Sequence, residues 1–177
     1  ADYAQAQGWR VEANLNNDIV GNSEGQSGVR DTTRARVFSE GTKTVETAAQ
    51  AERRRYNGGE VDSSSRNLAR FIDGVADRYL SNFDVEMIYR TDRYGRGGDQ
   101  VEMLRHGFPA VRISEGAENY DRQHQDLRTE NGVEYGDTIE GVDFDYLGQV
   151  ARLNIVAMGA LANAPASPLG VTIEGAV

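Results

Sequence analysis

The chain has 177 residues, a length that suits one domain with a buried core rather than two domains. Its 28 acidic side chains outnumber 19 basic ones, and the net charge of -9 argues against nucleic acid as a partner. The lack of cysteine excludes disulfides, thiol catalysis and cysteine-bound zinc, and two histidines are too few for a multi-histidine metal site. We find neither an apolar run that could span a membrane nor a signal-peptide pattern.

The first part of the chain predicts one strand followed by a loop. Residues 1–8 are typical of the last turns of a helix that Gly8 ends, which suggests that the chain begins inside a larger domain. Apolar and polar side chains alternate over 9–16, the pattern of a strand with one buried face. Asp18 is therefore expected at or just beyond the end of this strand, and the Gly, Ser and Asn residues of 21–28 predict a loop.

The middle of the chain alternates between strands and helices. Short strands are expected at 35–39 and 85–89, and a helix rich in Ala and Glu at 45–55. The clearest helix follows serines 63–65, which can cap its first turn, because apolar side chains recur at helical spacing over 68–79.

A loop rich in Gly and Arg, at 93–98, precedes the next helix and strand. Asp99 is expected to cap a short helix over 101–105, and a strand follows at 109–113. His106 ends this helix, where an imidazolium would favour the helix dipole, so we expect a structural role for it.

The last third begins with a polar connection, 114–142, that shows no periodic segment. A connection of this length is uncommon inside a compact domain unless it is a binding loop or lid, and His124 lies in it. A final helix is predicted over 143–162, and a new strand begins in the tail 170–177. The face of this helix expected to be apolar carries Phe144, Leu147, Ala151, Asn154, Met158 and Leu161.

This order of elements predicts an α/β fold, a three-layer sandwich with a mostly parallel mixed sheet. Residues 1–165 would form part of such a domain, and 166–177 would be a linker and a further strand. Ligands of these sheets bind outside the carboxyl ends of the strands, the edge to which Asp18 and the loop after Ile113 belong.

The residues alone leave the chemistry open. Asp18 could face a metal or substrate, or form an Asx turn after its strand. His124 could be a metal ligand, an acid or base, or a solvated loop residue. The loop from Arg93 to Asp99 could bind an anion, but it lacks the spacing of the known nucleotide-binding motifs.

Four segments in consistent order resemble a known family. They are GWRVEANLNNDIVGN, RGGDQVEMLRHGFPAVRISE, NYDRQHQD and FDYLGQVARLNIVAMGALANAP, which together cover about residues 1–165. These segments are similar to the second half of the catalytic domain in zinc aminopeptidases of metallopeptidase family twenty-eight, clan MH.

The resemblance implies a site with two zinc ions that hydrolyses N-terminal peptide bonds of peptides or proteins. Asp18 matches the family's Asp ligand to one zinc, and His124 matches the His ligand to the other. The family's remaining ligands and its general-base Glu come from His-x-Asp and Glu-Glu motifs in the N-terminal half of the domain, a half that the matched segments do not include. We therefore expect the chain alone to bind zinc weakly or not at all and to be inactive.

The chain departs from the family pattern at two places. Asp99 matches, but Gln100 stands where the family usually has His, so both are expected near the substrate or behind the ligands rather than on the metal. Gln123 precedes His124 where many members have Tyr, and Tyr120 is the candidate that would support the oxyanion.

The resemblance leaves two further functions open. A noncatalytic relative would use the same fold as a scaffold for protein contacts, and a glutaminyl-cyclase-like acyltransferase would use one zinc. The family also implies a secreted or periplasmic location. The tail, 166–177, resembles the linker and first strand of a β-sandwich module that follows the catalytic domain in some relatives.

Overall fold

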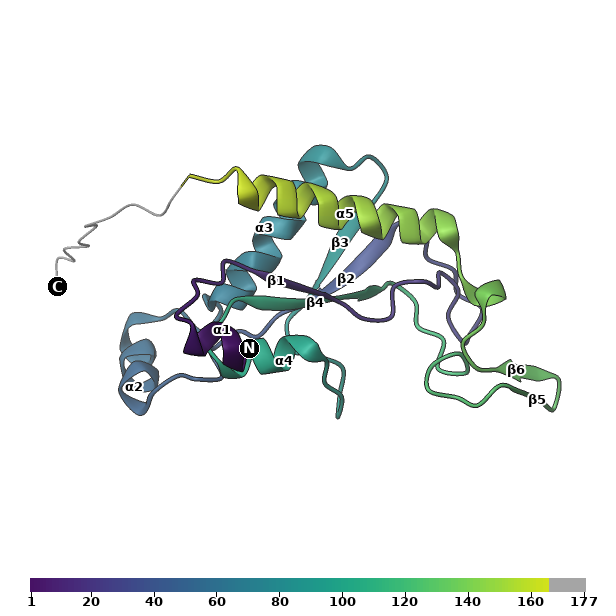
Figure 1. Cartoon of the computed structure of the whole chain (residues 1–177), viewed down its shortest axis with the longest axis horizontal. Helices are drawn as coiled ribbons and strands as arrows, with labels where there is room; N and C mark the ends of the chain where they lie inside the picture. Colours follow the sequence, from purple (N-terminus) through teal and green to yellow (C-terminus); the bar gives the residue numbers. More distant parts are fainter. Residues whose placement is uncertain (166–177) are drawn as a thin grey trace.

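A four-stranded sheet forms the centre of the computed structural model, which describes residues 1–165 (Figure 1). The strand order is β1 (Asn14–Asn17), β4 (Ala110–Glu115), β2 (Arg34–Phe38), β3 (Asp84–Ile88). β1 pairs with β4 and β2 with β3 in parallel, while β2 and β4 are antiparallel. This confirms the predicted α/β class with a mostly parallel mixed sheet.

Helices cover both faces of this sheet (Figure 1). The helices of the described residues are α1 (Asp2–Ala6), α2 (Ala48–Asn57), α3 (Ser64–Tyr79), α4 (Asp99–Arg105) and α5 (Phe144–Ala162), of which α2 buries no side chain. α3 and α5 pack against each other and bury one face, and α4 lies on the opposite face against β4 and β1. No helix within residues 1–165 combines the length and apolarity needed to cross a bilayer.

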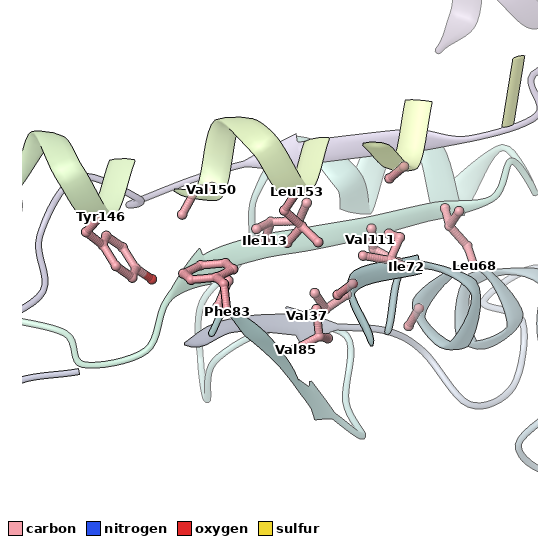
Figure 2. Close-up of a cluster of buried hydrophobic side chains, with 14 residues drawn as sticks. Val37, Leu68, Ile72, Phe83, Val85, Val111, Ile113, Tyr146, Val150 and Leu153 are labelled. Carbon is pink, nitrogen blue, oxygen red and sulfur yellow. The ribbon is translucent and has the colours of Figure 1, made fainter. Parts of the chain in front are cut away.

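The apolar core lies between the sheet and helices α3 and α5, as Figure 2 shows. Its main side chains are Val37, Leu68, Ile72, Phe83, Val85, Val111, Ile113, Tyr146, Val150 and Leu153. The helical spacing predicted after the serines is confirmed, and the Ser63 side chain caps α3 by accepting a 3.0 Å hydrogen bond from the Arg66 amide.

α5 buries a different face from the one predicted. Tyr146, Val150, Leu153 and Ala157 point into the core, whereas Phe144 of the predicted face is 62% exposed. The helix is apolar on several sides, so its periodicity alone could not decide which stripe meets the sheet.

β1 is shorter than the alternating pattern predicted. Asn14 is opposite Ala110, the first residue of β4, so no strand of the described part of the chain pairs with the residues before Asn14. Trp9 instead packs edge-on against Tyr3, with ring centroids 5.5 Å apart.

The first helical residue of α4 is Asp99 and its cap is Gly98, so the prediction that Asp99 caps the helix is wrong.

The long connection after β4 contains regular structure that the sequence analysis did not predict. β5 (Arg128–Glu130) and β6 (Val133–Tyr135) form a hairpin, followed by a 3₁₀ helix, η1 (Ile139–Gly141). Asn131 and Gly132 join the hairpin strands with φ angles of 52° and 80°, the left-handed pair that an Asn-Gly turn favours. The strand predicted in the tail and the module after it lie outside the described residues.

Candidate functional site

A cavity of about 440 Å³ lies at the carboxyl ends of β1 and β4. Asp18 follows β1 directly, and Glu115 is the last residue of β4, so the parallel pair brings both to the same edge. His124 comes from the long connection and lines the same cavity, together with Asp137. The structure thus brings the two predicted zinc ligands, Asp18 and His124, to one cavity.

The backbone fixes where Asp18 projects. Its amide donates to the Ile113 carbonyl at 3.0 Å, which continues the β1–β4 pairing by one residue. Ile19 then adopts a φ of 62°, a strained conformation for a β-branched residue, and turns the chain away from the sheet. The Asp18 side chain remains 35% exposed and lines the cavity.

A buried ionic network lies behind Asp18. Arg112 is completely buried, and its Nη1 lies 3.1 Å from Asp18 Oδ2 and 2.9 Å from Asp92 Oδ1. Burial alone would raise the pKa of Asp92, but hydrogen bonds from Gln100 and the Arg93 amide, with the charge of Arg112, hold that pKa below its ordinary value. Asp92 is therefore a fixed anion that anchors Arg112.

Gln100 belongs to this network and does not reach the cavity. Its Nε2 donates to Asp92 Oδ2 at 2.8 Å, and its Oε1 accepts from Asn16 Nδ2 at 2.8 Å. Asp99 is exposed in the first turn of α4 and is not among the residues that line the cavity. A Cβ on Gly98 would lie 2.4 Å from Gln100 Oε1 and 3.1 Å from Asp18 Oδ2, so this approach requires glycine.

Two glutamates near the cavity were missed by the sequence analysis. Glu115 is 1% exposed, accepts a 2.9 Å hydrogen bond from the Asn22 amide, and has its pKa raised by burial to about 7. Glu118 pairs with Arg36 and, at 2.6 Å, with Arg93 Nη1. No local pattern in the sequence indicates that Glu115 is buried or that Glu118 is paired, since Arg36 and Arg93 are distant from Glu118 in the chain.

His124 and Tyr120 lie on the loop that borders the cavity. His124 is exposed and has a φ of 54°, so the chain turns sharply at this residue. Tyr120 is 45% exposed and does not line the cavity, although it was the candidate for oxyanion support. Gln123 lines the cavity and accepts from Arg93 Nη1 at 3.1 Å.

The second histidine has a structural environment, as expected. His106 Nδ1 lies 2.7 Å from the Glu102 carbonyl, and Nε2 lies 2.7 Å from Asp2 Oδ1. These contacts raise the pKa of His106 and join α1 to α4.

The donors present fit zinc in kind but are too few for a complete site. A carboxylate oxygen and an imidazole nitrogen are ordinary zinc ligands, but protein sites supply about three or four. Within residues 1–165, a group of three donors close enough to share one ion occurs at Asp73, Asp77 and Asp84, away from Asp18 and His124. The cavity therefore brings together two donors of the kinds that zinc binds.

No protein-family model matches the chain. The chain is 48% identical over 167 residues to a probable zinc metalloprotease of Leptosphaeria maculans, covering 94% of this chain and 39% of that protein. Similar matches are a probable zinc metalloprotease of Pyrenophora teres f. teres, at 46% identity with 94% and 35% covered, and one of Pyricularia oryzae, at 43% with 93% and 33% covered. The chain spans less than half the length of these relatives.

Proposed function

We propose that this chain is part of a zinc metallopeptidase, an aminopeptidase of family twenty-eight that hydrolyses N-terminal peptide bonds. The observation that carries the proposal is the convergence of Asp18 and His124 on one cavity at the carboxyl edge of the sheet. The names of the relatives support zinc and proteolysis, and the aminopeptidase type is supported by the motif resemblance alone.

In this proposal Asp18 and His124 each bind one of two zinc ions, and the other ligands and the general base come from a preceding half of the domain. Zinc held there would polarise the scissile carbonyl and lower the pKa of a bound water. Val20, Val142 and Leu147 line the cavity with apolar side chains, which suit an uncharged side chain of the substrate. With two ligands of its own, the isolated chain would bind zinc weakly and be inactive.

The test uses the full-length protein that contains this chain, with Asp18→Ala and His124→Ala. Zinc content and hydrolysis of aminoacyl anilides are measured, and both are expected to fall in each variant. His106→Gln is the matched control for the histidine, because His106 contacts Asp2 and Glu102 away from the cavity. Wild-type metal content and activity in both alanine variants would overturn the assignment.

The loop from Arg93 to Asp99 gives little support to an anion-binding function. Arg93 is 8% exposed, and its guanidinium is already held by Glu118 at 2.6 Å and Gln123 at 3.1 Å. Arg90 lies over the ring of Tyr94, 4.3 Å from its centroid. An anion that bound Arg93 or Arg90 would have to compete with these contacts.

The location of the parent protein also belongs to this proposal. We infer a secreted or periplasmic enzyme, because the family that the motifs resemble acts there. Fractionation of cells that express the full-length protein, followed by immunodetection, checks the location independently of activity.

A further inference from the structure

We propose that Arg112 is a positioning residue, which holds one oxygen of Asp18 so that the other is presented to the cavity as a metal ligand. The inference rests on the proposed function, because it concerns Asp18 in the role of zinc ligand. Arg112 belongs to β4 and does not line the cavity, so the proposal places a supporting side chain behind the residues that do.

Arg112 holds both the side chain and the main chain of Asp18. Its Nη1 lies 3.1 Å from Asp18 Oδ2, and its Nη2 donates to the Asp18 carbonyl at 3.3 Å. One contact holds a carboxylate oxygen and the other holds the main chain from which the side chain projects, so a single planar guanidinium limits the orientations open to the carboxylate. Oδ2 also faces Gly98, whose missing Cβ would lie 3.1 Å away, so Oδ1 is the oxygen left for the cavity.

Arg112 is itself held rigidly from the other side. It is fully buried, and Nη1 donates to Asp92 at 2.9 Å and 3.2 Å. Asp92 in turn accepts from Gln100 Nε2 at 2.8 Å and from the Arg93 amide at 2.6 Å. Because Asp92 and Arg112 are buried and Asp18 is 35% exposed, the partly free carboxylate takes its orientation from the fixed guanidinium.

A purely stabilising role explains this arrangement poorly. The Nε atom of Arg112 is buried without a hydrogen-bond partner among the residues that the structure describes. A buried ion pair is weak evidence for stability, since desolvation offsets much of the attraction. Side chains that orient metal ligands, by contrast, typically change metal affinity by about 10-fold to 100-fold when they are replaced.

The experiment measures zinc affinity in the full-length protein by competition with a chromophoric chelator, and the visible absorption spectrum after cobalt(II) substitution. Arg112→Met is expected to weaken zinc binding by about 100-fold and to alter the cobalt spectrum, and Arg112→Lys by about 10-fold. Lysine keeps the charge but cannot reach both contacts of Asp18 with a planar fork. Hydrolysis of an aminoacyl anilide is followed in parallel.

Arg66→Lys is the matched control. Arg66 is 1% exposed and donates to Ser39 Oγ at 2.6 Å and to the Ser39 carbonyl at 2.7 Å, and no carboxylate within residues 1–165 pairs with it. It shares the burial of Arg112 and does not line the cavity, so its variant should retain the zinc affinity and the cobalt spectrum.

Asp92→Asn covers the case in which the Arg112 variants do not fold. It is nearly isosteric and does not touch the cavity, but it removes the charge that anchors Arg112, so zinc binding should weaken. Unchanged affinity and cobalt spectrum in the folded Arg112 variants, or in Asp92→Asn where those do not fold, would overturn the inference.

The two proposals fail in different ways. If Asp18→Ala loses zinc while Arg112→Lys, Arg112→Met and Asp92→Asn keep it, the positioning role alone is wrong. If Asp18→Ala itself retains wild-type zinc affinity, the assignment of Asp18 as a ligand is wrong and the role of Arg112 falls with it.

Discussion

The Ser23 hydroxyl donates a 2.6 Å hydrogen bond to Asp143 Oδ2 and thereby joins the loop after β1 to the first turn of α5. Asp143 Oδ1 caps the helix by accepting from the Tyr146 amide at 3.0 Å, and Arg30 Nη2 donates to Oδ2 at 3.1 Å. The hydrogen bonds from Ser23 and Tyr146 lead the contacts that lower the pKa of Asp143 to about 2. This loop borders the cavity, so α5 and the site are tied together by one carboxylate.

Asp143→Ala should lower the free energy of unfolding by about 1–2 kcal/mol at neutral pH, because the helix loses its cap. The folded pKa lies below the unfolded value of 3.8, so the contribution is complete above about pH 4 and is lost as the pH falls toward about 2. Urea unfolding as a function of pH checks this. Asp145→Ala, in the same helical turn with an exposed side chain, is the control and should cost much less.

Glu115→Gln should stabilise the protein above neutral pH. Burial raises the pKa of Glu115 from 4.5 to about 7, so the unfolded chain ionises first as the pH rises and wild-type stability falls through that range. The shift corresponds to a gain on the order of 3 kcal/mol for the variant at about pH 8 and a small difference at about pH 4. Glutamine keeps an oxygen that can accept from the Asn22 amide.

Thermal unfolding of wild type and Glu115→Gln at several pH values measures this effect. Glu52→Gln, on the exposed surface of α2, is the control and should leave the pH profile as it is. A wild-type profile that stays flat between about pH 4 and pH 8 would contradict a raised pKa at Glu115.

The helices and strands could be predicted where a local sequence pattern specifies them. The serine cap and apolar spacing located α3, and the strand pattern placed Asp18 at the end of β1. The Asn131–Gly132 pair signals a hairpin turn, so β5 and β6 could have been found from the sequence. The buried stripe of α5 could not, because several sides of this helix are apolar and the tertiary packing chooses among them.

The buried side chains behind Asp18 could not be predicted from sequence patterns. Arg112 is a polar residue in a strand whose six positions are all buried, so no alternation indicates its direction. Its partner Asp92 lies 20 positions away, and Asn16 and Gln100 are separated by 84. The pairing of β1 with β4, and the packing of α4 and the loop after β3 against these strands, bring the four side chains together, and nothing local in the sequence records this.

Leu153→Ala should destabilise the protein by about 2–5 kcal/mol, because the side chain is completely buried between α5 and the sheet (Figure 2). Ile155→Ala on the same helix is the control, since Ile155 is 64% exposed and should cost far less. Urea unfolding of both variants compares them directly. Equal losses would mean that the outer face of α5 is covered in the folded protein.

The contact between His106 and Asp2 predicts a titration that NMR can follow. The Glu102 carbonyl and the Asp2 carboxylate both accept hydrogen bonds, and only the imidazolium can donate to both at once, so the pKa of His106 is raised above 6.5. The stability from this contact is complete below the unfolded pKa and is lost as the pH rises through the folded one. Asp2→Asn should lower the pKa of His106 while the Glu102 contact remains. The chain has two histidines, so the His124 resonances provide an internal reference in the same spectra. An unchanged His106 titration in Asp2→Asn would show that the contact between α1 and α4 does not persist in solution.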